Sequence, residues 1–220
     1  MDLLADVRAR NTDLIKLVAG VTDAEARADS ALPGWSRGHV LTHLANAATA
    51  FARQVDHAVD GRLVAVYDGG RPARDAAIEA GAGQPATVLR QRIHDSAAAF
   101  ERAVRRLGPD DLGLPVTYRD GVVQDVLDSH WREVEIHSTD LLLGRTSADW
   151  TPEFCEHLFD YLLAARSPDG VRLVLRAGDR VWSGGSGTPV EVSGERTDLA
   201  AWLAGRKRLD GAVPELSPWP

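Results

Sequence analysis

Residues 36–59 read SRGHVLTHLANAATAFARQVDHAV, and this stretch decides the fold. Its apolar residues recur every three or four positions, as they do along one face of a helix. They are Val40, Leu41, Leu44, Ala47, Phe51 and Val55. Ser36 precedes the pattern and is a typical helix N-cap. The stretch therefore predicts an amphipathic helix of about six turns over residues 37–59.

Similar periodicity continues on both sides of this helix. The further helices that it predicts cover residues 2–19, 74–80, 85–107 and 124–143. Four of the five helices are long, which is typical of a four-helix bundle. We therefore expect a mostly α chain whose residues 1–147 form such a bundle.

Two local patterns predict further elements in the segments between these helices. Thr22 and Glu25 have the spacing of a capping box, which predicts a short helix after residue 22. The apolar residues around Asp120-Gly121 predict a tight β-hairpin over residues 116–123, because this dipeptide favours a type I′ turn.

The sequence pattern changes after Trp150. The elements that it predicts there are a helix over residues 152–165, strands over 171–176, 180–182 and 189–192, and a helix over 199–203 capped by Thr197. Residues 148–220 are therefore expected to form a small α+β domain.

Composition excludes several classes of protein. The chain has 220 residues, is 44% apolar and carries a net charge of −7, which argues against general nucleic-acid binding. No apolar run is long enough to span a membrane, and the N-terminal residues MDLLADVRARNTDL lack the apolar core of a signal peptide. Cys155 is the only cysteine, which excludes an internal disulfide and a cysteine cluster. We expect a cytoplasmic protein, with Cys155 as a buried structural thiol.

The histidines raise the question of a metal site. Glu133 and His137 are four residues apart on one predicted helix, so their side chains project from the same face. Together with His43 they would give three ligands and leave a coordination position open, as in catalytic zinc sites. By spacing alone, His39 or His130 could replace one of these histidines. In the alternative without a metal, His43 is a core histidine and Glu133–His137 is a surface pair.

Other sequence patterns contribute less to a functional assignment. Glu135 points away from Glu133 on the same helix and is expected in solvent. The H-E-x-x-H, G-x-S-x-G, P-loop and G-x-G-x-x-G motifs are absent from the sequence. A metal protease, an α/β-hydrolase and the common nucleotide-binding folds are therefore not indicated.

Two segments resemble a known family. GWSRGHVLTHL over residues 34–44 is similar to the G-W-[ST]-x-x-H-x-x-x-H segment of the mycothiol-dependent maleylpyruvate isomerases. REVEIHSTDL over residues 132–141 resembles the R-E-V-x-[IV]-H-x-x-D-L segment of the same family. The resemblance implies a DinB-like four-helix bundle followed by a small C-terminal α+β domain.

The resemblance also implies a site. Its metal ligands would be His43, Glu133 and His137, with zinc as the expected ion and mycothiol as the thiol cofactor. The thiolate would add to the cis double bond of maleylpyruvate, the new single bond would rotate, and loss of the thiol would leave fumarylpyruvate. Arg74 and Arg206 would hold carboxylates and stabilise the enolate.

The resemblance leaves several points open. Arg71 or Arg208 could take the place of the two arginines named above, because the arginine segments align more loosely than the metal ligands. A mycothiol S-transferase acting on another electrophile is the alternative enzyme, and a non-catalytic metal- or ligand-binding module is a third reading. In the enzyme readings the partners are mycothiol and a small, carboxylate-bearing electrophile, with neither nucleic acid nor membrane expected.

Overall fold

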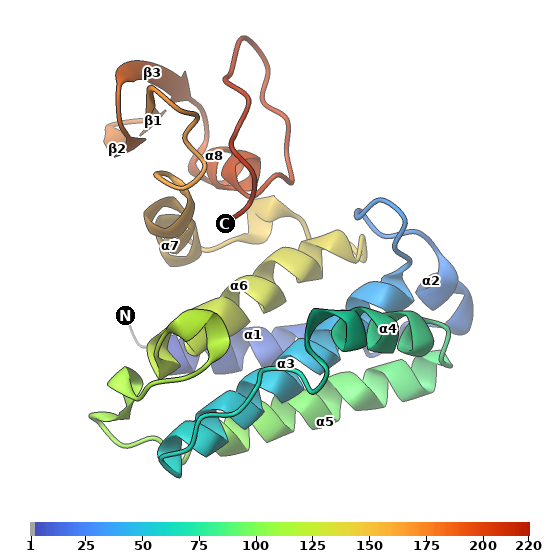
Figure 1. The fold of residues 1–220 in the computed structure, drawn as a ribbon. Helices are drawn as coiled ribbons and strands as arrows, with labels where there is room; N and C mark the ends of the chain where they lie inside the picture. Colours follow the sequence, from blue (N-terminus) through green and yellow to red (C-terminus); the bar gives the residue numbers. More distant parts are fainter. Residues whose placement is uncertain (1–2) are drawn as a thin grey trace. The chain divides into compact units, whose positions relative to one another are not determined.

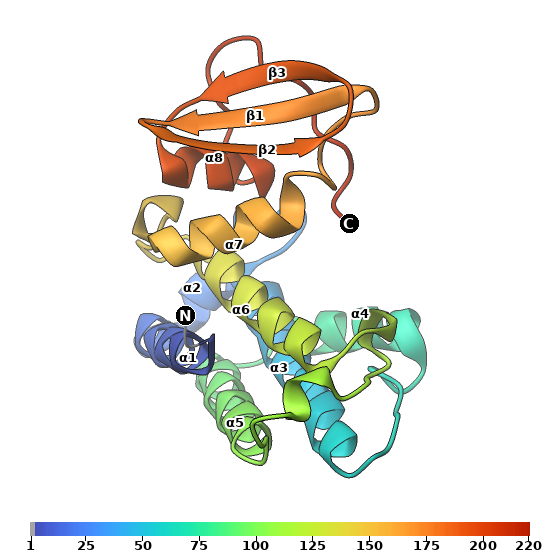
Figure 2. The ribbon, with the colours of Figure 1, turned by 90° about the vertical axis from the view of Figure 1, so that its left-hand side faces the viewer.

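The computed structural model describes residues 3–220 and divides the chain into two compact units. The first ends at Arg145 and the second begins at Thr146, two residues before the boundary expected from the sequence. Asp2, at the start of the expected first helix, lies outside the described residues. Figures 1 and 2 show a first unit built of helices and a second that contains the sheet.

The first unit contains four long helices. They are α1 (Leu3–Val18), α3 (Arg37–Val59), α5 (Ala86–Val104) and α6 (Val123–Asp140). Helix α3 packs against both α5 and α6, and α1 packs against the same two helices (Figure 1). Their shared core consists of buried apolar residues, among them Leu14, Val40, Leu41, Leu44, Leu89, Ile93 and Val134. This unit confirms the predicted mostly helical fold.

Local sequence signals explain where these helices begin. The Ser36 hydroxyl accepts a hydrogen bond from the backbone N–H of His39, so the predicted N-cap of α3 is confirmed. Thr22 and Glu25 form the predicted capping box of the short helix α2 (Asp23–Arg27). Both are properties of four consecutive residues, and for that reason they are readable from sequence.

The helix predicted over residues 74–80 is longer than expected. The observed helix, α4, runs Gly70–Ala82. Pro72 lies in its first turn, where a backbone N–H has no intrahelical partner to lose. The end of α4 packs closely on α3, because a Cβ atom on Gly38 would lie 2.2 Å from the carbonyl oxygen of Ala82. Glycine is therefore required at the start of α3.

The predicted hairpin over residues 116–123 is wrong. The structure has a single β-bridge between Pro115 and Val122, enclosing a 3₁₀ turn over Tyr118–Asp120, after a first 3₁₀ turn over Asp111–Gly113. The two residues with positive φ are Arg119 and Asp120, so the turn lies one residue earlier than expected. Helix α6 begins at Val123, immediately after the bridge, and leaves no residues for a second strand.

The second unit is the predicted small α+β domain. Its elements are a 3₁₀ turn (Ser147–Asp149), α7 (Pro152–Leu162), β1 (Val171–Ala177), β2 (Arg180–Gly185), β3 (Thr188–Ser193) and α8 (Arg196–Leu203). The sheet order is β2-β1-β3, with β1 antiparallel to β2 and parallel to β3 (Figure 2). Thr197 does not cap α8 as expected, because the helix already begins at Arg196 and Glu195 is the N-cap residue.

Candidate functional site

The structure brings His43, Glu133 and His137 together in the helical unit. His43 projects from α3, and the other two project from α6 one turn apart. Glu133 Oε2 lies 2.8 Å from His43 Nε2 and 3.1 Å from His137 Nε2. One ligand atom from each of the three residues lies within 4.8 Å of the others. Trp35 packs edge-on against the ring of His43, 5.7 Å between centroids, which limits how that ring can turn.

These three side chains fit a divalent metal ion. In a tetrahedral site with metal–ligand distances of about 2.0–2.1 Å, neighbouring ligand atoms lie roughly 3.3–3.4 Å apart. The observed separations from Glu133 are shorter than this by about half an ångström or less. Side chains that are 6% (His43) to 27% (Glu133) exposed still leave access for an exogenous ligand. Small side-chain movements would therefore convert the hydrogen-bonded cluster into a coordination site.

Asp140 orients the ring of His137. Its carboxylate Oδ2 lies 2.8 Å from His137 Nδ1 and the residue is 1% exposed. A carboxylate accepts the Nδ1 proton, so the other ring nitrogen, Nε2, is directed at Glu133. Histidines that bind metals commonly have such an outer carboxylate. This arrangement supports His137 as a ligand through Nε2.

The cluster changes the pKa values of its members. Burial would lower the pKa of His137, but hydrogen bonds to Asp140 and Glu133 raise it to about 9. Burial would raise the pKa of Glu133, but His43 and His137 hold it well below its usual value. Burial lowers the pKa of His43 despite the nearby Glu133 carboxylate. Without a metal at pH 7, the cluster therefore contains an ionised Glu133, a protonated His137 and a neutral His43.

Arg74 contacts the cluster from α4. Its Nη2 lies 3.2 Å from His43 Nδ1, and its Nη1 donates to Asp75 Oδ1 at 2.6 Å. A guanidinium only donates hydrogen bonds, so His43 Nδ1 is the acceptor and Nε2 carries the proton directed at Glu133. Ligation of a metal through Nε2 needs that proton on Nδ1 instead. Binding of a metal by His43 through Nε2 would therefore require Arg74 to leave this contact.

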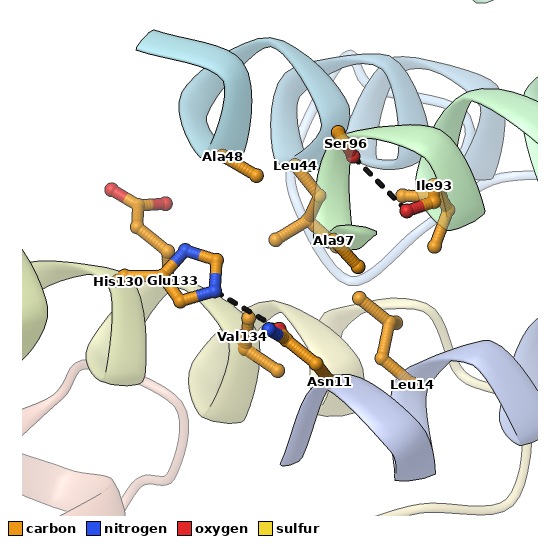
Figure 3. Close-up of a pocket in the computed structure, with 10 residues that line it drawn as sticks. All are labelled: Asn11, Leu14, Leu44, Ala48, Ile93, Ser96, Ala97, His130, Glu133 and Val134. Atoms are coloured by element: carbon orange, nitrogen blue, oxygen red, sulfur yellow. Dashed lines mark hydrogen bonds between the residues drawn. The ribbon is translucent and has the colours of Figure 1, made fainter. Parts of the chain in front are cut away.

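Neither alternative histidine joins the cluster. His39 belongs to the cap of α3, with its Nδ1 3.1 Å from the backbone nitrogen of Ser36. His130 is 2% exposed, its Nε2 lies 2.9 Å from Asn11 Oδ1, and it stacks on Phe100. Figure 3 shows the ring of His130 bonded to Asn11 in a mostly apolar pocket, with the carboxylate of Glu133 directed away from it. Burial lowers the pKa of His130 to about 3, which keeps this ring neutral.

The expectation that Glu135 lies in solvent is wrong. The residue is 1% exposed and forms ion pairs with Arg145 and, at 3.5 Å, with Arg10 of α1. The cause is that α6 packs against α1 on this side as well as against α3 on the other. Glu135 is therefore a buried structural carboxylate.

A cavity of about 790 Å³, including its open mouth, lies next to the cluster. It is lined by Asn46, Thr49, Ala50, Arg53, Val66, Tyr67, Asp68, Ala73, Arg74, Ala77 and Arg92. Arg74 belongs to both the cavity wall and the contact with His43. Arg74 lies beside Tyr67 and lowers the pKa of its hydroxyl, but burial raises that pKa by more, so the hydroxyl stays protonated. Tyr67 lies in an irregular segment without a sequence motif, so no pattern in the chain marks it.

The second predicted arginine lies in the other unit. Arg206 is half-buried after α8, and its Nη1 donates to the carbonyl oxygen of Ala204 at 2.9 Å. Arg71 and Arg208, the alternatives, are exposed. Cys155 is fully buried in α7, in agreement with a structural thiol.

Comparisons with known proteins agree with this arrangement. A family model described as the mycothiol maleylpyruvate isomerase N-terminal domain matches residues 7–142, and the MDMPI C-terminal domain model matches residues 149–217. No curated protein sequence matched. Among residues 3–220, no helix has the length and apolar character needed to cross a membrane.

Two solved structures are similar over nearly the whole chain. One is the crystal structure of the mycothiol-dependent maleylpyruvate isomerase, with 26% identity, and the other is a histidine-to-alanine mutant of that enzyme, with 25% identity. In each case the TM-score is 0.89, and the match covers 99% of this chain and 96% of the other. Since the two family models also span most of its length, the chain belongs to the mycothiol-dependent maleylpyruvate isomerase family.

Proposed function

We propose that this protein is a metal- and mycothiol-dependent isomerase that converts maleylpyruvate to fumarylpyruvate. The observation that carries the proposal is the cluster of His43, Glu133 and His137 with Asp140 behind it. Family membership and the similarity to the solved isomerase support the choice of reaction. The single, buried Cys155 is compatible with the reducing cytoplasm, where we expect the protein to act.

Zinc is the metal that we propose. Two imidazoles and one carboxylate are common ligands of catalytic zinc, and three protein ligands leave a position open. A bound zinc ion would lower the pKa of the mycothiol thiol, so that a thiolate is available at neutral pH. In this arrangement His43 and His137 would ligate through Nε2, and Asp140 would hold the proton on Nδ1 of His137.

The sulfur of mycothiol would add to the cis double bond, the resulting single bond would rotate, and loss of the sulfur would restore the double bond in the trans form and regenerate the thiol. Between addition and loss of the sulfur, negative charge would lie on the substrate as an enolate. Arg74 is the cation nearest to the cluster in the cavity wall, and once released from His43 it can donate two hydrogen bonds to that charge. Tyr67, as its neighbour in the cavity wall, would position the guanidinium. For Arg206, a contact with a second carboxylate remains a proposal from the family resemblance.

The test is to incubate the zinc-loaded protein with mycothiol and maleylpyruvate while following both thiol and product. We expect fumarylpyruvate to form without loss of thiol. Stoichiometric consumption of mycothiol would instead support an S-transferase, and no reaction at all would support a binding module.

Two variants connect the reaction to the cluster. His137→Ala should lose both the metal and the activity, because one of three ligands is removed. His94→Ala is the matched control, since His94 lies in α5 with a side chain 62% exposed and outside the cluster. Full turnover by metal-free His137→Ala protein would contradict the proposed function.

A further inference from the structure

The cavity beside the cluster contains an arginine without a matching carboxylate. Arg92 projects into it from α5, and its Nη2 donates to Asn46 Oδ1 at 2.7 Å. Among residues 3–220 no carboxylate oxygen lies within ion-pair distance of this guanidinium, and its hydrogen-bond partner is a neutral amide. A half-buried cation without a counter-ion favours binding of an anion.

The other two arginines of the cavity differ from Arg92 in this respect. Arg53 forms an ion pair with Asp68 at 2.9 Å, and Arg74 forms one with Asp75 at 2.6 Å. Their charges are therefore at least partly balanced inside the protein. Arg92 is the arginine of this cavity whose charge is available to a ligand.

The guanidinium of Arg92 is also held in place before any ligand binds. Asn46 fixes it from α3, and it packs against α4 at Gly81, where an added Cβ atom would lie 2.8 Å from Arg92 Nη1. The missing side chain at Gly81 leaves the space that the guanidinium occupies. A group fixed in this way loses little freedom when it binds a ligand.

Arg92 of α5 contacts α3 at Asn46, which lies close along that helix to His43 of the cluster. Asn46 is three residues after His43 on α3, which is a little less than one turn, or about 4.5 Å along the axis. Arg74 lines the same cavity and contacts His43. A ligand that reacts beside His43 could therefore extend one helical turn into the cavity and meet Arg92.

We propose that Arg92 binds the substrate carboxylate remote from the reacting double bond and thereby determines specificity for a dicarboxylate, with Asn46 as its positioning residue. This inference rests on the proposed function. Maleylpyruvate carries a carboxylate at each end, whereas the cysteine carboxyl group of mycothiol forms an amide and has no negative charge. The anion that matches Arg92 is therefore the substrate and not the thiol.

The experiment compares Arg92→Gln with Arg90→Gln in the full-length, zinc-loaded protein. Arg90 is the matched control, because it lies on the same helix and its Nη1 donates to the carbonyl oxygen of Val21, outside the cavity. Calorimetric titration with maleylpyruvate in the absence of mycothiol measures binding without turnover. We expect Arg92→Gln to weaken this binding by about 10- to 100-fold, as for loss of a charged hydrogen bond, and Arg90→Gln to leave it unchanged.

Steady-state kinetics give a second readout. Arg92→Gln should raise KM for maleylpyruvate by a similar factor, with a smaller effect on kcat and none on KM for mycothiol. Arg92→Lys keeps the positive charge but not the planar fork, so it should lose less affinity than the Gln variant. The Lys variant also preserves the test if Arg92→Gln fails to fold.

The outcomes separate this inference from the proposed function. Unchanged maleylpyruvate binding and KM in both Arg92 variants would overturn it while leaving the isomerase intact. A raised KM for mycothiol alone would also overturn it, since the cavity would then bind the sugar part of the thiol. Maleylpyruvate binding by wild type that depends on Arg92 but leads to no isomerisation would support this site and contradict the proposed function.

Discussion

Substitution of Asp140 by Asn tests how this carboxylate supports the proposed metal site of His43, Glu133 and His137. The buried carboxylate of Asp140 accepts a hydrogen bond from Nδ1 of His137 at 2.8 Å and contributes to the high pKa of that ring, about 9. An asparagine keeps the size of the side chain but removes its charge. The change therefore weakens two effects of Asp140 that act on metal binding in opposite directions.

The first effect is on the neutral ring as a ligand. Removal of an outer-shell partner typically lowers metal affinity about 10- to 100-fold, or roughly 1.4–2.7 kcal/mol. The second effect is competition with protons, because the metal must displace a proton from His137. With a pKa of about 9, this competition lowers the apparent affinity of wild type at pH 7 by about 100-fold. Asp140→Asn lowers the pKa of His137 and so relieves part of that loss.

We therefore expect the difference in zinc affinity between Asp140→Asn and wild type to depend on pH. Well above pH 9, where His137 is largely neutral in both proteins, Asp140→Asn should bind zinc about 10- to 100-fold more weakly than wild type. At pH 7 this difference in zinc affinity should be smaller, because in the variant zinc competes less with a proton on His137. Competition with a chromophoric chelator at the two pH values measures both affinities, and NMR titration of the metal-free protein reports the pKa of His137.

Asp128→Asn is the matched control for this experiment. Asp128 lies on the same helix, and its carboxylate accepts a hydrogen bond from Gln124 at 3.2 Å, away from the cluster. This variant should bind zinc like wild type at both pH values. Equal zinc affinity of Asp140→Asn and wild type above pH 9, with an unchanged His137 pKa, would refute the role of Asp140 as the outer carboxylate of the site.

Three further predictions concern the stability of the helical unit. The pKa of His130 is about 3 in the folded state and 6.5 in the unfolded state, so this ring takes up a proton on unfolding below pH 6.5 and should lower the free energy of unfolding by about 2 kcal/mol at pH 5. Urea unfolding should therefore show that His130→Gln loses less stability than wild type between pH 7 and pH 5. An equal loss of stability in both proteins would contradict this. The raised pKa of His137 stabilises the metal-free fold below pH 6.5, and this contribution should disappear as the pH rises through about 9; the His137→Ala variant, melted without metal, should lack that dependence. Arg145→Met should lower stability by at least about 1 kcal/mol, because the buried carboxylate of Glu135 loses its nearer partner; an unchanged urea midpoint would show that Arg10 alone is sufficient.

The helices are predictable where their signals are local. Apolar residues recur every three or four positions over residues 36–59, and together with the Ser36 cap this pattern predicts the observed bounds of α3. The sequence predicts the turn before α6 at Asp120-Gly121, one residue after its observed position. A tight turn with positive φ favours Asp-Gly, yet the structure has it at Arg119-Asp120, because the Val122 N–H is bonded to Asp125 and belongs to the start of α6.

Burial in the site region depends on which helices meet, and this is not a local property. Glu135 is on the side of α6 opposite to Glu133, but α1 covers that side, so both faces of the helix are occupied. Tyr67 and Arg92 join the cavity from a loop and from α5. No spacing rule connects residues on such different elements. The members of the cavity can be identified only once α3, α4 and α5 are placed together.

The choice among the four histidines shows where sequence reasoning can be extended. His130 and His137 are seven residues apart, so they face nearly the same side of α6, but they lie about 10.5 Å apart along the axis. Only one of these two histidines can share a site with His43. Their position along the axis of α6 decides which one, because both project from nearly the same face. The role of His39 is readable from sequence: it occupies the third position after the cap residue Ser36, where a Glu or Gln normally returns a hydrogen bond to the cap backbone. An imidazole at that position already has a partner, which leaves His43 as the histidine of this segment able to meet Glu133.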